Sequence, residues 1–216
     1  MTNRKIQYWV IPPETNAEFV ASILNLHRQL AAGHLSDDRI PSHMGGLGDE
    51  MEVLWQRMAQ TLLPAGLPQY AFMIANFSAC LATAQARGLG AEDAAAWDRA
   101  ADRYLGLYVD NALAAQFRST FDFVRKVEGG LGLATATPPQ TVLTAPEATL
   151  AAMRIAPAEA EAVLRDFNTS WRSGVKGLND DATRYFVSGA AAGGPAVNLL
   201  PVVLKRVMTG FLALYD

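Results

Sequence analysis

Histidine and carboxylate side chains are the groups of this chain that could bind a metal ion or transfer protons. The residues that could form such a site lie close together in the sequence: His27, His34, His43, Asp37, Asp38 and Glu50. A zinc site requires them to converge on one point. His27 and His34 are spaced to share a helical face, but Gly33 interrupts that helix and no His-Glu-x-x-His pattern is present. We therefore expect exposed or capping histidines and no metal site.

Two nucleophilic side chains also need an interpretation. The single cysteine, Cys80, falls on a helical stripe with Phe77 and Leu81, which favours a buried structural thiol and excludes an internal disulfide. Ser170 precedes Trp171, but no histidine lies nearby in the sequence to activate its hydroxyl. We expect Trp171 to be an anchor in the hydrophobic core.

Paired acids and glycine-rich segments complete the search for chemistry. The doublets Asp37-Asp38 and Asp180-Asp181 occupy neighbouring positions, which do not face each other on a helix, so we expect solvated carboxylates. The glycine-rich segments at 45–48, 129–132 and 193–194 lack the Lys-Ser/Thr end of a phosphate-binding loop. We predict no catalytic, cofactor-binding or metal-binding residue, no cofactor, and no enzymatic activity.

The composition is that of an ordered, mildly acidic protein. Of the 216 residues 50% are hydrophobic and 18% charged, which is enough apolar surface to fold. The net charge is -3 with no long basic run, so a nucleic-acid-binding protein is disfavoured. The apolar segment 195–215 contains Lys205 and Arg206 in mid-span, which predicts a helix packed on a core and not a membrane span.

The elements needed to position any site are helices, so the predicted fold class is all-α. Apolar residues recur every three or four positions in six stretches: 14–33, 49–63, 67–88, 91–128, 157–186 and 198–215. The second and third, separated by a Pro-Ala-Gly-Leu-Pro turn, should form an antiparallel pair. Gly106 weakens the fourth and would permit a kink there. Only residues 6–11 look extended, and the Gly/Pro-rich stretch 129–146 predicts a flexible connection.

The stretch 164–186 carries the most regular stripe in the chain. Its predicted buried face is the following set: Leu164, Phe167, Trp171, Val175, Leu178, Ala182 and Tyr185. Charged residues such as Arg165, Arg172 and Asp180 fall on the other side.

The pattern Phe-x-x-Ser-Trp-[basic]-x-x-Val-x-x-Leu-x-x-Asp-x-x-[basic]-x-Phe in this stretch resembles the C-terminal region of the vacuolar protein sorting-associated protein 52 family. That family supplies a subunit of the Golgi-associated retrograde protein tethering complex. Residues 69–81 resemble the family's Phe-x-Ile-x-Asn-[aromatic] segment, and residues 113–128 resemble the helix that follows it. The resemblance covers about residues 20–215.

The resemblance implies an elongated helical rod of consecutive antiparallel bundles with a non-enzymatic role in endosome to trans-Golgi network retrograde transport. The implied partners are the other subunits of the tethering complex, small GTPases and membrane-fusion (SNARE) proteins, and not nucleic acid. The implied location is the cytoplasmic face of the trans-Golgi network and endosomes, held peripherally through partners.

The corresponding domain prediction has four parts. Residues 1–20 are expected to be an unrelated or mis-joined leader, residues 21–131 a helical bundle, residues 132–156 a flexible linker, and residues 157–216 a truncated C-terminal helical segment. Residues 1–21 locally resemble a segment of insertion-sequence transposases, which makes a transposase-derived fragment with DNA-related activity one alternative. A generic helical bundle that binds a small ligand is the other.

Overall fold

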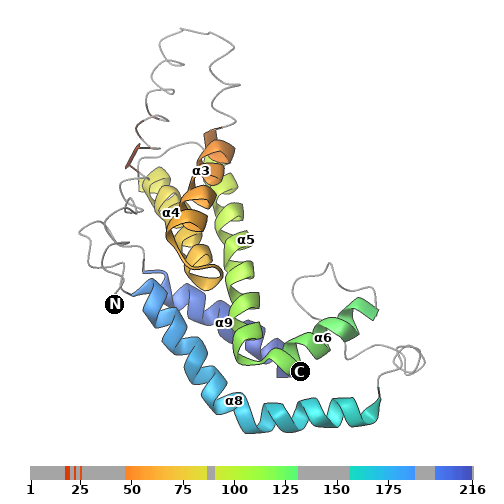
Figure 1. The fold of residues 1–216 in the computed structure, drawn as a ribbon. Helices are drawn as coiled ribbons and strands as arrows, with labels where there is room; N and C mark the ends of the chain where they lie inside the picture. The colour runs from red at the N-terminus through yellow and green to blue at the C-terminus, as the bar shows by residue number, and fades with distance from the viewer. Residues whose placement is uncertain are drawn as a thin grey trace. The chain divides into compact units, whose positions relative to one another are not determined.

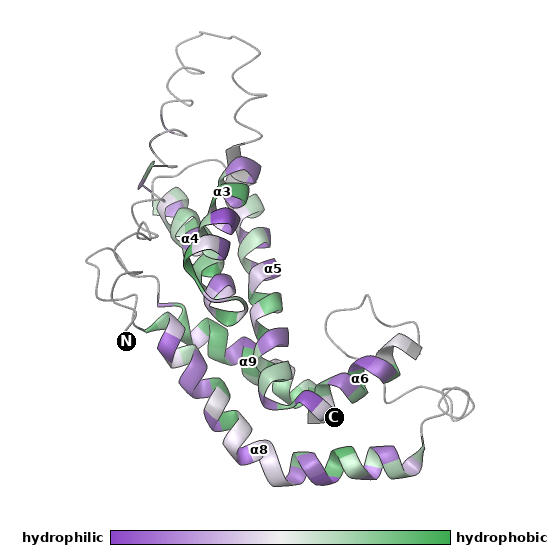
Figure 2. Ribbon diagram, in the orientation of Figure 1, coloured by the Kyte–Doolittle hydropathy of each residue, from purple (hydrophilic) through white to green (hydrophobic). Residues whose placement is uncertain are grey.

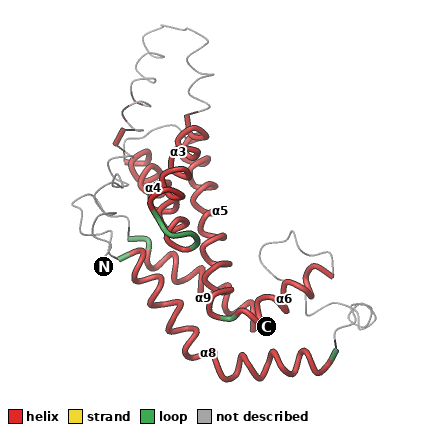
Figure 3. The backbone as a smooth tube through the Cα atoms, in the orientation of Figure 1, coloured by secondary structure: helices red, strands yellow, loops and turns green. Residues whose placement is uncertain are grey.

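The computed structural model describes residues 47–86, 91–130, 156–187 and 198–215, together with Glu18, Phe19, Ser22 and Asn25. In these ranges the chain forms helices α3 (Leu47–Leu62), α4 (Leu67–Ala86), α5 (Ala91–Gln116), α6 (Arg118–Gly130), α8 (Pro157–Phe186) and α9 (Leu200–Tyr215). Figures 1 and 3 show these helices, and the described residues contain no strand. The prediction of an all-α fold is confirmed. The predicted extended segment 6–11 lies outside the described residues, as does most of the predicted helix 14–33.

The chain divides into two compact units. Unit 1 comprises residues 1–108 and 185–199, and unit 2 comprises residues 109–184 and 200–216. The division falls inside α5, between Tyr108 and Val109. The predicted domain boundaries near residues 20, 132 and 156 fall in or beside stretches outside the described residues, so they stay predictions.

The core of unit 1 lies between α3, α4 and α5. Trp55 of α3 meets the ring of Phe77 of α4 edge-on at 5.1 Å between centroids, and Phe77 stacks on Tyr104 of α5 at 5.8 Å. The predicted pair of helices is formed by α3 and α4, which a tight turn joins (Figure 1). Gly66 in that turn has a φ of 94°, a conformation that glycine adopts without steric cost.

The core of unit 2 is a cluster of three aromatic rings, Phe117, Phe167 and Phe211. Phe117 lies 5.6 Å from Phe167 of α8 and 5.2 Å from Phe211 of α9, and the latter two stack at 5.8 Å. Each buried side chain of this size contributes roughly 1.5 to 3 kcal/mol to the free energy of unfolding. Val203 and Val207 of α9 are also buried, as is Phe211, so α9 packs one apolar face inward.

The prediction of one helix over residues 91–128 is wrong at Phe117. Helix α5 ends at Gln116, α6 begins at Arg118, and Gly106 lies within uninterrupted α5. Backbone hydrogen bonds from Phe117 N to Leu113 O (2.7 Å) and from Phe121 N to Phe117 O (2.8 Å) bridge the break. The chain therefore bends without opening into a loop. The bend coincides with the residue whose ring joins the aromatic cluster of unit 2.

The described helices also bear on membrane association. Within the part of the chain that the structure describes, no helix is both long enough and apolar enough to cross a bilayer. In α9, Lys205 and Arg206 are exposed, as expected for a helix that packs one face on a core.

Candidate functional site

The residues that could bind a metal are mostly outside the described residues: His27, His34, His43, Asp37 and Asp38. Glu50 is exposed in the first turn of α3. Among the residues that the structure does describe, no three histidine, cysteine or acidic side chains are grouped as metal ligands would be.

Cys80 lies on the buried side of α4. Burial raises the pKa of its thiol from 9.0 to about 12. Because the thiolate is the nucleophilic form, this side chain is almost wholly unreactive near neutral pH. The expectation of a buried structural thiol is confirmed.

The acidic doublet on α8 is split between two different partners. Asp180 accepts a hydrogen bond from Lys176 Nζ at 2.5 Å, and Asp181 accepts one from Gln116 Nε2 at 3.4 Å. The two carboxylates therefore do not share a site for acid–base chemistry. The Ser170 hydroxyl donates to the Asp166 carbonyl oxygen at 2.9 Å, which is a local hydrogen bond within the helix.

The predicted buried face of α8 is wrong at two of its largest residues. Leu164 is 61% exposed and Trp171 is 40% exposed, so Trp171 is not a core anchor. The face of α8 that is buried contains Phe167, Gly174, Leu178 and Ala182. Three of these four, Phe167, Leu178 and Ala182, belong to the predicted face, so the prediction fails at Leu164 and Trp171 and not along the whole helix.

The backbone of α8 packs closely on the core of unit 2 at Gly174. A side-chain carbon added at Gly174 would lie only 2.5 Å from Phe117 Cε1, and closer still to Cζ. The backbone of α8 therefore approaches the Phe117 ring at the one position on this face that has no side chain. The bulkier Trp171, three residues earlier, is exposed. Figure 2 shows hydrophobic and hydrophilic residues alternating along the length of α8.

Two arginines flank the exposed apolar residues of α8. Arg165 and Arg172 directly follow Leu164 and Trp171 in the sequence, and all four side chains are exposed. The guanidinium of Arg172 lies 5.2 Å from the centroid of the Trp171 ring, a cation–π contact that orders both side chains. We call these four residues, Leu164, Arg165, Trp171 and Arg172, the α8 surface.

A polar network in unit 1 joins α3 to α5. The Glu52 carboxylate accepts hydrogen bonds from Arg103 Nη2 and Tyr104 Oη, both at 2.6 Å. Gln56 Nε2 donates to Tyr104 Oη at 2.7 Å and to Glu52 Oε1 at 3.0 Å. Burial raises the pKa of the Tyr104 hydroxyl, and the neighbouring Glu52 carboxylate adds to this. The hydroxyl therefore stays protonated and acts as a donor.

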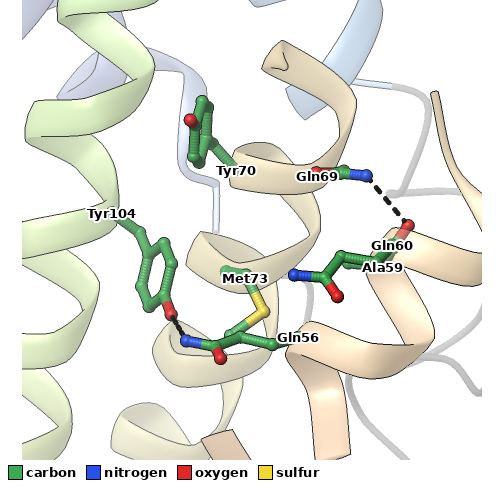
Figure 4. A pocket seen from close by; sticks show the side chains of 7 residues that line it. All are labelled: Gln56, Ala59, Gln60, Gln69, Tyr70, Met73 and Tyr104. Atoms are coloured by element: carbon green, nitrogen blue, oxygen red, sulfur yellow. Dashed lines mark hydrogen bonds between the residues drawn. The ribbon is translucent and has the colours of Figure 1, made fainter. Parts of the chain in front are cut away.

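A pocket of about 270 Å³ lies beside this network, and Figure 4 shows the side chains that line it. The lining residues are Gln56, Ala59, Gln60, Gln69, Tyr70, Met73 and Tyr104. The amide N–H groups of Gln56 are directed to Glu52 and Tyr104, and those of Gln69 to the carbonyl oxygens of Ala59 and Leu63 at 3.4 and 3.3 Å. Much of the hydrogen-bonding capacity of the pocket is thus used within the protein, and part of it completes the C-terminal end of α3.

Comparison of the chain with known protein families, with characterised proteins and with solved structures finds no match. The functional conclusion therefore rests on the residues and the geometry described above. The amide groups that line the pocket are largely hydrogen-bonded within the protein, whereas the α8 surface leaves apolar and cationic side chains exposed.

Proposed function

We propose that this chain is a non-enzymatic subunit of a multisubunit vesicle-tethering complex that acts in retrograde transport from endosomes to the trans-Golgi network. One observation carries the proposal: the segment 164–186, on which the family resemblance rests, lies in the continuous helix α8 and exposes Leu164 and Trp171. Tryptophan is enriched at protein–protein interfaces and among the residues that contribute most to binding.

The chemistry of the described residues supports a binding role over a catalytic one. The only thiol is kept protonated by burial, and the neighbouring acids of α8 are each held by a different partner. The proposed partners are the other tethering subunits, with small GTPases and SNARE proteins further along the same process. Membrane association would be peripheral, through these partners, on the cytoplasmic face of the trans-Golgi network and endosomes. A rod of consecutive antiparallel bundles is part of the same proposal.

Co-purification with the other tethering subunits tests the proposal. The tagged chain is co-expressed with the three partner subunits, and we expect at least one of them to be retained at equal stoichiometry. The double variant Leu164→Ala/Trp171→Ala should lose the partner while keeping its helical circular dichroism, because both residues are exposed. The matched control is Val202→Ala/Leu212→Ala, two exposed apolar residues of α9.

Two outcomes would overturn the proposal. One is that no tethering subunit is retained by the wild-type chain. The other is DNA binding that requires a divalent metal ion, which would favour the transposase-derived alternative based on residues 1–21, outside the described residues.

A small-ligand function is the second candidate, and the pocket beside Tyr104 favours it. The pocket combines the Met73 side chain with amide and hydroxyl groups, a mixture typical of sites for small polar organic molecules. Soaking the protein with a library of small amides and alcohols while recording chemical shifts of Met73 would test it. Changes in the chemical shifts of both Met73 and Tyr70 on addition of the same compound would support a ligand site.

A further inference from the structure

The α8 surface repeats one pair of side chains at a fixed interval. Leu164 and Arg165 are followed seven residues later by Trp171 and Arg172. Seven residues of helix span roughly 10.5 Å and return to nearly the same side. The surface therefore presents two exposed apolar residues in line, each followed in the sequence by an exposed arginine. A heptad interval of this kind matches the spacing of contacts between two packed helices.

The two guanidinium groups of this surface have no acidic partner among the described residues. Two acidic residues of α8 have other partners: Asp166 accepts a hydrogen bond from the Ser119 hydroxyl, and Asp180 accepts one from Lys176. Glu161, one turn before Arg165, forms no ion pair with it in the described part of the chain. Two exposed cations beside an apolar stripe favour a binding partner that supplies carboxylates at the same interval.

We infer that the α8 surface binds an amphipathic helix whose apolar stripe is flanked by glutamate or aspartate residues seven positions apart. The inference rests on the proposed function, because it specifies the chemistry of the partner that a scaffold subunit would hold. The partner's apolar stripe would cover Leu164 and Trp171, and its carboxylates would face Arg165 and Arg172. The Arg172 guanidinium already lies against the Trp171 ring, so part of the surface is ordered before binding.

A helix is favoured over a lipid surface because of how α8 is packed. The neighbouring face of α8 is buried at Phe167, Gly174 and Leu178. Only a narrow apolar stripe of the helix is therefore left that could insert into a lipid surface. Membrane-surface helices present a broad apolar face and many cations. The α8 surface has two apolar residues and two arginines, which suits a single partner helix.

Binding of designed peptides to the full chain tests the inference. The probe is a three-heptad helical peptide with leucine at the a and d positions and glutamate at the e and g positions. The control peptide carries lysine in place of every glutamate. We expect isothermal titration calorimetry to show binding of the glutamate peptide, with affinity at least about tenfold higher than for the lysine peptide, and a loss of affinity as salt is raised.

Charge reversal on the protein gives the decisive comparison. The variant Arg165→Glu/Arg172→Glu should reverse the preference, so that the lysine peptide binds more tightly than the glutamate peptide. Trp171→Ala should weaken both peptides. The matched control, Arg57→Glu/Arg99→Glu, makes the same change of net charge at exposed positions of α3 and α5 and should leave the preference unchanged.

Several results would overturn the inference. These are equal binding of the two peptides, absence of binding to both, or equal effects of the two charge-reversal variants. Sedimentation of the chain with phosphatidylserine vesicles that depends on Arg165 and Arg172 would assign the surface to a membrane instead. A dimer in analytical ultracentrifugation that Trp171→Ala dissociates would assign it to a second copy. Retention of tethering subunits without peptide binding would refute the inference and leave the proposed function standing.

Discussion

Replacing Gly174 with alanine tests how closely α8 approaches the core of unit 2. The added methyl group would lie 2.5 Å from Phe117 Cε1, about 1 Å short of ordinary van der Waals contact, which begins at 3.4 Å. The Phe117 ring is buried and packs on Phe167 and Phe211, so it cannot swing into solvent. Either that ring or the whole of α8 must shift.

The magnitude follows from two opposing effects. Overpacking a well-packed core costs typically about 1 to 3 kcal/mol, whereas alanine is favoured over glycine in a helix interior by about 1 kcal/mol. We therefore expect Gly174→Ala to change the free energy of unfolding by between about zero and 2 kcal/mol, in the destabilising direction. The sign alone is a weak test, so the comparison with other glycines decides it.

Two other helical glycines provide the controls. At Gly106 of α5 an added methyl group would meet no atom within 4 Å, so Gly106→Ala should gain the full helix preference of about 1 kcal/mol. At Gly177 the methyl group would meet the amide tip of Gln116, which can rotate away, and the effect should be intermediate. The clash at Gly174 is then the difference between its variant and Gly106→Ala, about 1 to 3 kcal/mol.

Urea unfolding followed by far-ultraviolet circular dichroism and by tryptophan fluorescence measures these differences. The two probes check whether the two units unfold together, which the use of a single unfolding free energy requires. If Gly174→Ala were as stable as Gly106→Ala, α8 would not approach Phe117 as described.

Three further predictions concern the cores and the polar network. Burial raises the pKa of Cys80 from 9.0 to about 12, so between these pH values the folded protein keeps a proton that the unfolded chain loses. The free energy of unfolding should therefore fall as pH rises from about 9 towards 12, by at most about 1.4 kcal/mol per pH unit. In Cys80→Ala the fall should be less steep. Equal slopes in urea titrations of the two proteins would contradict this, as would rapid reaction of native Cys80 with a thiol reagent at pH 8. Tyr104→Phe removes a donor to Glu52 and an acceptor for Gln56 and should destabilise unit 1 by about 1 kcal/mol, an effect that disappears in the background of Glu52→Ala/Gln56→Ala if these hydrogen bonds are its cause. Phe211→Ala should lower the free energy of unfolding by about 3 to 5 kcal/mol, whereas Leu212→Ala, at a neighbouring residue that is 55% exposed, should change it by no more than about 0.5 kcal/mol. Similar midpoints of unfolding for the two variants would argue against the aromatic cluster.

The positions of the helices follow from local chemistry and could therefore be predicted. Helix α8 begins at Pro157, because proline lacks the N–H group that would be unsatisfied there and its φ suits the first turn. Helix α3 ends shortly before Pro64, and the turn that follows contains Gly66 at positive φ. The buried thiol of Cys80 also follows from its place on an apolar stripe of α4.

The bend at Phe117 could not be predicted in the same way. Apolar residues continue with helical spacing on both sides of it, and neither proline nor glycine marks it. The backbone hydrogen bonds across the bend are those of a helix, so the local sequence carries no signal to stop. The bend reflects contacts of Phe117 with Phe167 and Phe211, which are about 50 and 94 residues away in the sequence.

The sequence by itself determined that this protein is all-α, roughly where its helices begin and end, and that its one thiol is buried, because these properties depend on spacing and on neighbours along the chain. Only the tertiary structure decided which side of α8 meets solvent. Hydrophobic periodicity gives weight to large apolar side chains such as Leu164 and Trp171, and none to Gly174. Yet the absence of a side chain at Gly174 is what allows α8 to approach the ring of Phe117, a residue 57 positions away in the sequence, whereas Leu164 and Trp171 are exposed.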